Sequence, residues 1–294
     1  NPGRSGGFNQ GPGIEKKDFP ANSWNFILTL EGAIVWASGV ARRYNAAAKG
    51  FLTSPFTVGI SPVGYNSSSN ADKPSKKDKR KPAEIWTPLW KQSVSYHELR
   101  SFLCEGRADV GRKTASTGIE FAESVSSLGI DRGISEFVRY SLLKRRGDSF
   151  VALPAGRFSV QERSESDLVR ELDPLLKRID RFLRDFKEPP ARFVSARRQI
   201  DEAIFDLLLH GGPDHVKFLV ASIGRIEQLI TQRDLSKTPK LNAPLIGLSP
   251  RWIVAADDNS LEVRIAISLA SIGGTDRVGP IRSNLAPVDP EKPW

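Results

Sequence analysis

The chain has 294 residues, of which 39% are hydrophobic, and this is enough to bury the core of one large or two ordinary domains. Its single cysteine, Cys104, excludes a disulfide framework within the chain and is typical of a cytoplasmic protein. The net charge of +9 lies entirely in residues 1–160, which hold 23 Lys and Arg against 14 Asp and Glu, whereas residues 161–294 hold 20 of each sign. This asymmetry favours a polyanionic partner for the first part, most often a nucleic acid. The alternative is a basic surface that binds no partner, which would have the same composition.

An apolar helix is predicted at residues 23–44, with Ser23 as its N-cap. The segment before it is rich in Gly, Pro and Asn, so no signal peptide is predicted. Polar residues such as Glu31 interrupt the helix, which favours a fully buried core helix over a membrane span. Because the chain contains no methionine, we expect it to be a piece of a longer protein.

Two short segments, 56–60 and 84–90, have the composition of β-strands, and Pro88 makes the second an edge strand. The polar stretch 67–81 between them is predicted to be a mobile basic loop. Its cations are candidates for contact with a nucleic-acid backbone, namely Lys73, Lys76, Lys77, Lys79, Arg80 and Lys81.

Two helices are predicted next. Ser95 and Glu98 form a capping box for a short helix that runs through Phe102, and a second helix spans 118–128. The stretch GRADVGRKT, which starts at residue 106, departs from a phosphate-binding loop because an arginine separates its second glycine from the lysine. Its cations remain candidates for phosphate contact, namely Arg107, Arg112 and Lys113.

The stretch SLGIDRGISEFVRYSLLKRRG, residues 127–147, is interpreted as a helix that begins at Asp131, with Ile134, Phe137 and Val138 as its apolar face. Three arginines spaced seven apart then lie on the opposite side, and basic residues crowd the end. These cations are predicted to contact phosphates, namely Arg132, Arg139, Lys144, Arg145 and Arg146. The alternative is an internal ion-pair stripe, with carboxylates such as Glu136 as partners of the arginines.

After this stretch, Pro154 and Gly156 predict a β-hairpin within residues 148–160. From Ser164 the pattern changes to three long amphipathic helices with short joints, and a fourth helix, split or continuous, spans 249–272. The expected packing residues are Leu168, Leu172, Leu176, Ile179, Phe205, Leu208, Phe218, Ile226 and Leu229. Since this part has no net charge, we expect it to serve subunit contacts more than DNA affinity.

The predicted fold class is therefore mainly α with a small β component. Residues 1–160 form an irregular basic α+β body on the nucleic-acid side, and residues 161–294 form an antiparallel helical bundle with a loose Pro-rich tail.

No catalytic constellation is found in the sequence. His210 and His215 are separated by GGPD, so one helical face does not present both as metal ligands. The acidic residues of the predicted helices alternate with arginines, which is typical of a solvated ion-pair face. We therefore predict a protein without enzymatic activity, metal or cofactor.

Several stretches in this order and spacing are similar to one family: NPGRSGGFN, WNFILTLEGAIVWASG, PFTVG, GYNSSS, EIWTPLW, SLGIDRGISEFVRYSLLKRRG and LSPRWIVAADD. With them the chain resembles the large subunit of the type I-G (formerly type I-U) CRISPR Cascade effector complex, from residue 1 to about residue 272. Family members are usually much longer than this chain.

The resemblance implies a non-catalytic subunit of an antiviral ribonucleoprotein in the cytoplasm, without a membrane contact. Such a subunit contacts the guide RNA and the target DNA, helps to recognise the PAM and stabilises the R-loop. Its protein partners are the backbone and guide-processing subunits and the helicase-nuclease that is recruited after target binding. The alternative is a purely structural scaffold subunit of a ribonucleoprotein assembly, whose charges serve protein packing.

Overall fold

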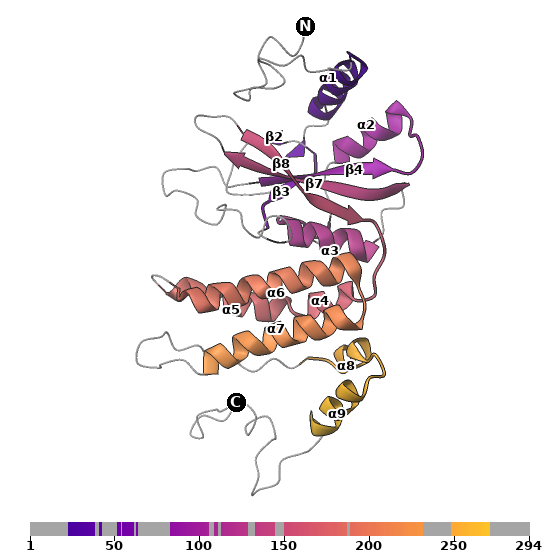
Figure 1. The fold of residues 1–294 in the computed structure, drawn as a ribbon. Coiled ribbons are helices and arrows are strands. Elements are labelled where there is room, and N and C mark those ends of the chain that lie inside the picture. Colours follow the sequence, from indigo (N-terminus) through magenta and orange to yellow (C-terminus); the bar gives the residue numbers. More distant parts are fainter. Residues whose placement is uncertain are drawn as a thin grey trace, which may run out of the picture. The chain divides into compact units, whose positions relative to one another are not determined.

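The fold of the chain is known from a computed structural model (Figure 1). It describes residues 23–38, 41–42, 52–53, 55–61, 63, 83–105, 109–110, 113–128, 133–144, 150–186, 189–231 and 248–270. The helices are α1 (Ser23–Ser38), α2 (Tyr96–Glu105), α3 (Gly118–Leu128), α4 (Ser166–Glu171), α5 (Asp173–Asp185), α6 (Ala191–His210), α7 (Pro213–Thr231), α8 (Arg251–Ala256) and α9 (Leu261–Ala270). The strands are β1 (Ala41–Arg42), β2 (Leu52–Thr53), β3 (Thr57–Gly59), β4 (Ala83–Trp90), β5 (Asp109–Val110), β6 (Lys113–Thr114), β7 (Ile134–Lys144) and β8 (Phe150–Ser159).

The fold is mainly α with a small antiparallel sheet, which confirms the predicted fold class. The described residues divide into two units: those up to Thr57 with those of Ser93–Arg107, and those of Val58–Gln92 with those from Ala108 onward. The boundary predicted at residue 160 therefore lies inside the second unit. None of the helices in the described ranges is long and apolar enough to cross a bilayer.

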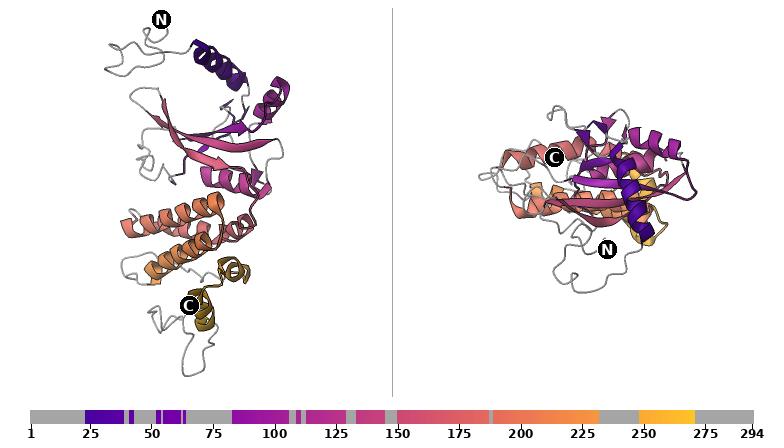
Figure 2. Two further views of the ribbon diagram at one scale, coloured as in Figure 1. Left: turned by 45° about the vertical axis from the view of Figure 1, so that its right-hand side comes forward. Right: turned by 90° about the horizontal axis from the view of Figure 1, so that it is seen from above.

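The sheet of the second unit has the strand order β3-β4-β7-β8, in which β7 pairs antiparallel with both β4 and β8 (Figures 1 and 2). One face of this sheet forms an aromatic core. Trp86, Phe137 and Phe158 come from the three longer strands and are fully buried. Phe121 of α3 packs on them, with its ring centroid 4.6 Å from that of Trp86 and 5.3 Å from that of Phe137. Burial of four large rings at one place explains why α3 covers this face.

Helices α3, α5 and α7 of the second unit pack against α6, whose buried face includes Phe193, Ile200, Ile204 and Leu207. The joint between α6 and α7 consists of Gly211 and Gly212, both at positive φ (67° and 87°), a conformation that favours glycine. With so short a joint, α7 returns antiparallel beside α6 (Figure 1). Helix α6 also contacts α3. The ring centroids of Phe158 in the sheet and Phe205 of α6 are 5.6 Å apart.

Most of the expected packing residues of the helical part are buried, as predicted, but Leu176 is half-buried and Phe218 is 44% exposed. The first of the three long predicted helices is broken into α4 and α5, because Pro174 in the first turn of α5 has no N–H to continue the α4 ladder. The fourth predicted helix is split into α8 and α9, and Leu261 of α9 is 67% exposed.

The capping box predicted at residues 95–98 is confirmed. The Ser95 and Glu98 side chains accept hydrogen bonds from each other's main-chain N–H, at 3.3 and 2.8 Å. They thus form the capping box at the start of α2, and α3 has the predicted bounds. The predicted edge position of the strand with Pro88 is wrong, because β4 has β3 on one side and β7 on the other. Since β3 has only three residues, it spans only part of the eight-residue β4.

The predicted buried helix at residues 23–44 is also wrong. The structure has α1 over Ser23–Ser38, and most of its described apolar side chains are exposed, among them Trp24 at 71%, Leu28 at 63% and Ile34 at 63%. Of the described elements, only α2 makes substantial contact with α1.

The predicted hairpin within residues 148–160 is a single strand, β8, with a bulge. Arg139 of β7 pairs with Gly156 and Tyr140 pairs with Pro154, so Ala155 is the extra residue. Gly156 takes a φ of 112°, which glycine adopts without strain. Proline and a glycine with positive φ belong to bulges as well as to turns, and the sequence pattern does not separate the two.

The predicted helix from Asp131 is wrong in the same way, because residues 134–144 form strand β7. Phe137, Arg139 and Ser141 alternate on its buried face, whereas Glu136, Val138 and Tyr140 are half-buried. The period is therefore two, not 3.6. Because the inward positions include an arginine and a serine, the strand lacks the alternation of apolar and polar residues by which strands are recognised.

Candidate nucleic-acid interface

Most of the cations predicted to contact nucleic acid lie outside the described residues. These are Lys73, Lys76, Lys77, Lys79, Arg80, Lys81, Arg107, Arg112, Arg132, Arg145 and Arg146. Lys113 belongs to β6 and Lys144 to β7, but only their backbone is described. The structure thus describes the side chain of one predicted site residue, Arg139.

Arg139 does not lie opposite the core, as the predicted helix required, but inside it. Its side chain is 1% exposed, and Nη2 donates a hydrogen bond of 2.9 Å to Oε2 of Glu84, which is fully buried. The Arg139 guanidinium carbon stands 4.4 Å from the ring centroid of Phe205 and 5.1 Å from that of Trp86. In this structure the arginine forms an internal ion pair and cation–π contacts. An internal ion pair is what the alternative interpretation predicted. Its carboxylate partner is Glu84, not the neighbouring Glu136.

Glu84 is held by several groups. Trp86 Nε1 donates to Glu84 Oε1 at 2.9 Å. A Cβ placed at Gly118, the first residue of α3, would overlap the Glu84 carboxylate, so only glycine fits at this close approach. Burial raises the pKa of Glu84 above its ordinary value, and the Arg139 charge opposes this shift. Two guanidinium nitrogens of Arg139, Nε and Nη1, have no hydrogen-bond partner among the described residues. The pair is thus a buried polar centre of the sheet, closed to solvent.

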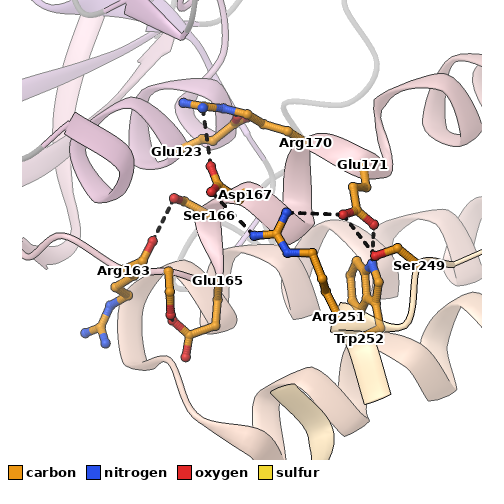
Figure 3. A network of polar contacts seen from close by, with 11 residues as sticks. Glu123, Arg163, Glu165, Ser166, Asp167, Arg170, Glu171, Ser249, Arg251 and Trp252 are labelled. Atoms are coloured by element: carbon orange, nitrogen blue, oxygen red, sulfur yellow. Dashed lines mark hydrogen bonds and ion pairs between the residues drawn. The ribbon is translucent and has the colours of Figure 1, made fainter. Parts of the chain in front are cut away.

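A second polar network joins α3, α4 and α8 (Figure 3). At one end, Arg170 Nε donates to Glu123 Oε1 at 3.1 Å, and Arg170 Nη1 lies 3.5 Å from Asp167. Arg251 continues the chain, at 3.5 Å from Asp167 and 3.6 Å from Glu171. Burial raises the pKa of Glu123 to about 7, against the opposing hydrogen bond from Arg170.

At its other end the network fixes α8. Glu171 accepts hydrogen bonds from Trp252 Nε1 at 2.9 Å and from Ser249 Oγ at 3.1 Å (Figure 3). The Trp252 side chain is 2% exposed, so its N–H needs this partner. The charged side chains of the network pair with one another, which is typical of a structural joint between helices.

A third polar contact binds the end of α6. The two Nη groups of Arg163 donate to the main-chain oxygens of His210 at 3.0 Å and Leu209 at 2.7 Å. Oε1 of Glu165 accepts the N–H of Gly212 at 2.9 Å. These bonds satisfy groups that every helix end leaves unpaired.

The rings of His210 and His215 stack with centroids 5.3 Å apart. Within the described ranges, no three His, Cys, Asp or Glu side chains are placed to hold a metal ion together.

The sequence interpretation missed a basic row on α5, formed by Lys177, Arg181 and Arg184. Its signal is the spacing i, i+4, i+7 opposite the buried Ile179 and Phe182. The spacing assigned to Arg132, Arg139 and Arg146 was i, i+7, i+14 on a helix, but residues 134–144, which include Arg139, form strand β7. Neither a family model nor a curated protein sequence matches the chain.

Proposed function

We propose that the chain is a non-catalytic large subunit of a type I CRISPR surveillance complex. In this role it contacts the guide RNA and the target DNA, helps to recognise the PAM and stabilises the R-loop. Its partners are the backbone and guide-processing subunits and the helicase-nuclease recruited after target binding, and its location is the cytoplasm. The resemblance to type I-G large subunits, which the sequence stretches between residue 1 and about residue 272 carry, supports membership of such a complex. The +9 charge confined to residues 1–160 is the observation that carries the nucleic-acid contact.

The direct test is binding of the full chain to labelled duplex DNA over a salt series. A protein that neutralises several phosphates loses affinity with a slope of about −0.9 per phosphate in a plot of log K against log salt. Replacing Lys76, Lys77 and Lys79 by Ser should make this slope shallower by about 2 to 3. A matched control replaces three exposed cations of the second unit, Arg157, Arg225 and Arg264, and should leave the slope nearly unchanged.

A slope near zero for the unmodified chain would contradict the contact. The same preparation, incubated with Mg²⁺ or Mn²⁺ and labelled DNA or RNA, should give no cleavage products. RNA that copurifies with the tagged chain from its own cells should be CRISPR guide RNA, because that partner distinguishes a surveillance subunit from a general DNA-binding protein.

A second candidate function is a structural scaffold subunit of a ribonucleoprotein. The burial of Arg139 against Glu84 favours it, since at least one predicted phosphate ligand serves packing instead. A scaffold would copurify with the complex but would show neither salt-dependent DNA binding by itself nor an effect of the lysine substitutions.

A further inference from the structure

Residues 161–294 have no net charge, but positive and negative residues are unevenly distributed along them. Residues 173–199, which include α5 and the start of α6, hold eight Lys and Arg against four Asp and Glu, a net charge of +4. Residues 200–231, which include the rest of α6 and α7, hold two against five, a net charge of −3. The positive part is large enough to attract a polyanion by itself.

Three of the four cations of α5 form one row on its outer surface. Ile179 and Phe182 bury the inner side of the helix, at 2% and 0% exposure. At about 100° per residue, Lys177, Arg181 and Arg184 fall within about 60° of one another on the opposite side. With a rise of 1.5 Å per residue, the row extends about 10 Å along the helix axis.

The neighbouring carboxylates leave this row only weakly neutralised. Asp180, which lies within the same helix, accepts a hydrogen bond of 2.8 Å from Arg197 Nε of α6, and Arg197 also pairs with Asp201. The Asp180 carboxylate is thus occupied by the other helix. Arg184 uses Nε for the main-chain oxygen of Asp180 at 3.2 Å, which leaves its charge uncompensated.

The two other members of the row are also available. Lys177 lies 3.7 Å from Asp173, but both side chains are largely exposed, at 73% and 59%, and such pairs contribute little. Within the described residues, the Arg181 side chain has no ion pair or hydrogen bond. A row of cations that face solvent remains.

We propose that the outer face of α5, formed by Lys177, Arg181 and Arg184, binds the phosphate backbone of a nucleic acid. This inference rests on the proposed function, because both require the chain to bind nucleic acid, but it assigns a contact to the helical part. A straight row of cations about one helical turn apart suits a backbone with regularly repeated charges. The row contains no aromatic side chain on which a base could stack, so the contact positions the strand without reading its sequence.

The test compares two variants of the full chain that lose the same charge. Arg181→Ala with Arg184→Ala removes two members of the row, and Arg225→Ala with Arg264→Ala removes two exposed arginines of α7 and α9 in the same unit. Binding to labelled oligo(dT) and to duplex DNA is measured over a salt series, and the melting temperature of each variant is recorded. The α5 variant should lose about 1.4 of the slope on oligo(dT), or about 1.8 on duplex DNA, and the control should lose almost none. The nucleic acid whose slope falls by the full amount expected for two phosphates is the one that lies on α5.

A conservative variant separates charge from folding. Arg181→Lys with Arg184→Lys keeps both positive charges and should retain most of the slope. Equal losses in the α5 variant and the control would overturn the inference while leaving the proposed function intact. Absence of salt-dependent binding by the unmodified chain would overturn both. If polyglutamate binds as tightly as oligo(dT), with the same dependence on Arg181 and Arg184, the face serves an acidic protein segment and the nucleic-acid assignment is wrong.

Discussion

Glu84 of β4 and Arg139 of β7 form an ion pair at the centre of the sheet, with 2.9 Å between Oε2 and Nη2 and side-chain exposures of 0% and 1%. The two residues are 55 positions apart in sequence, so the pair exists only in the folded sheet. Removing two charges from water costs several kcal/mol for each ion, which their attraction repays only when both are present.

Replacing one residue of this pair should therefore lower the free energy of unfolding more than replacing both. We expect Glu84→Leu to lower the free energy of unfolding by about 3–5 kcal/mol, because it leaves the Arg139 charge buried and unpaired. Glu84→Leu combined with Arg139→Met should recover a large part of this loss. Urea unfolding of the single and double variants measures both. Glu136→Gln, which removes the partner of the exposed Arg157, is the control and should cost less than about 1 kcal/mol. A double variant less stable than the single one would contradict the expectation.

Replacing two helical glycines by alanine should change the free energy of unfolding in opposite directions. Gly118→Ala places a methyl group into the Glu84 carboxylate and should lower the free energy of unfolding by about 1–3 kcal/mol or more. Gly224→Ala, in the middle of α7, meets no atom within 4 Å and should raise it by about 0.5–1 kcal/mol. Thermal unfolding of the two variants gives the comparison. Similar shifts at the two positions would mean that the carboxylate does not occupy this place.

Glu123 should make stability depend on pH near neutrality. Its folded-state pKa of about 7 lies above the ordinary value of 4.5, so the folded chain binds this proton more tightly than the unfolded chain does. Stability from this group is fully present below about pH 4.5 and is lost as the pH rises through about 7, with a total of up to about 3 kcal/mol. Glu123→Gln should equal the unmodified chain near pH 5 and be more stable near pH 8. A variant that is less stable at the higher pH would show that the ion pair with Arg170 outweighs the burial.

Glu171 should control the attachment of α8. Its substitution by Ala leaves the buried Trp252 N–H without its acceptor, which costs about 1–3 kcal/mol locally. We expect faster hydrogen exchange in α8 with little change in α6 and α7, which hydrogen exchange with mass spectrometry resolves. Asp167→Ala is the matched control, because its contacts to Arg170 and Arg251 are long (3.5 Å each) and exposed. Equal exchange in the two variants would contradict the role of Glu171.

The sequence predicted those elements whose signals are local. The capping box of Ser95 and Glu98 and the glycines after α6 act within a few residues, and α2, α3, α6 and α7 follow the predicted order. Strand β7 was misassigned because Ile134, Phe137 and Val138 also satisfy helical spacing. The residue that breaks its alternation is Arg139, whose partner Glu84 is distant in sequence.

The candidate interface was harder to predict than the fold. Whether an arginine meets a carboxylate or the solvent depends on tertiary neighbours, as the different environments of Arg139 and Arg181 illustrate. Arg139 belongs to a seven-residue spacing of arginines, and Arg181 lies between Lys177 and Arg184, which are also seven residues apart. Only α5 has the helical backbone that turns such a spacing into an outer row. Backbone conformation must be known before such a pattern indicates a surface.

The contacts made by the segment after β8 have a practical consequence for dividing the chain. The N–H of Arg163 bonds to the Ser126 oxygen of α3, while its guanidinium holds the end of α6. Phe205 of α6 packs against both Phe158 and Arg139 of the sheet. A cut at residue 160, where composition and charge change, would strip these partners from each fragment and expose Phe158 and the buried Arg139 of the sheet to water. Neither fragment is then expected to be a soluble, independently folding piece, so expression boundaries belong elsewhere.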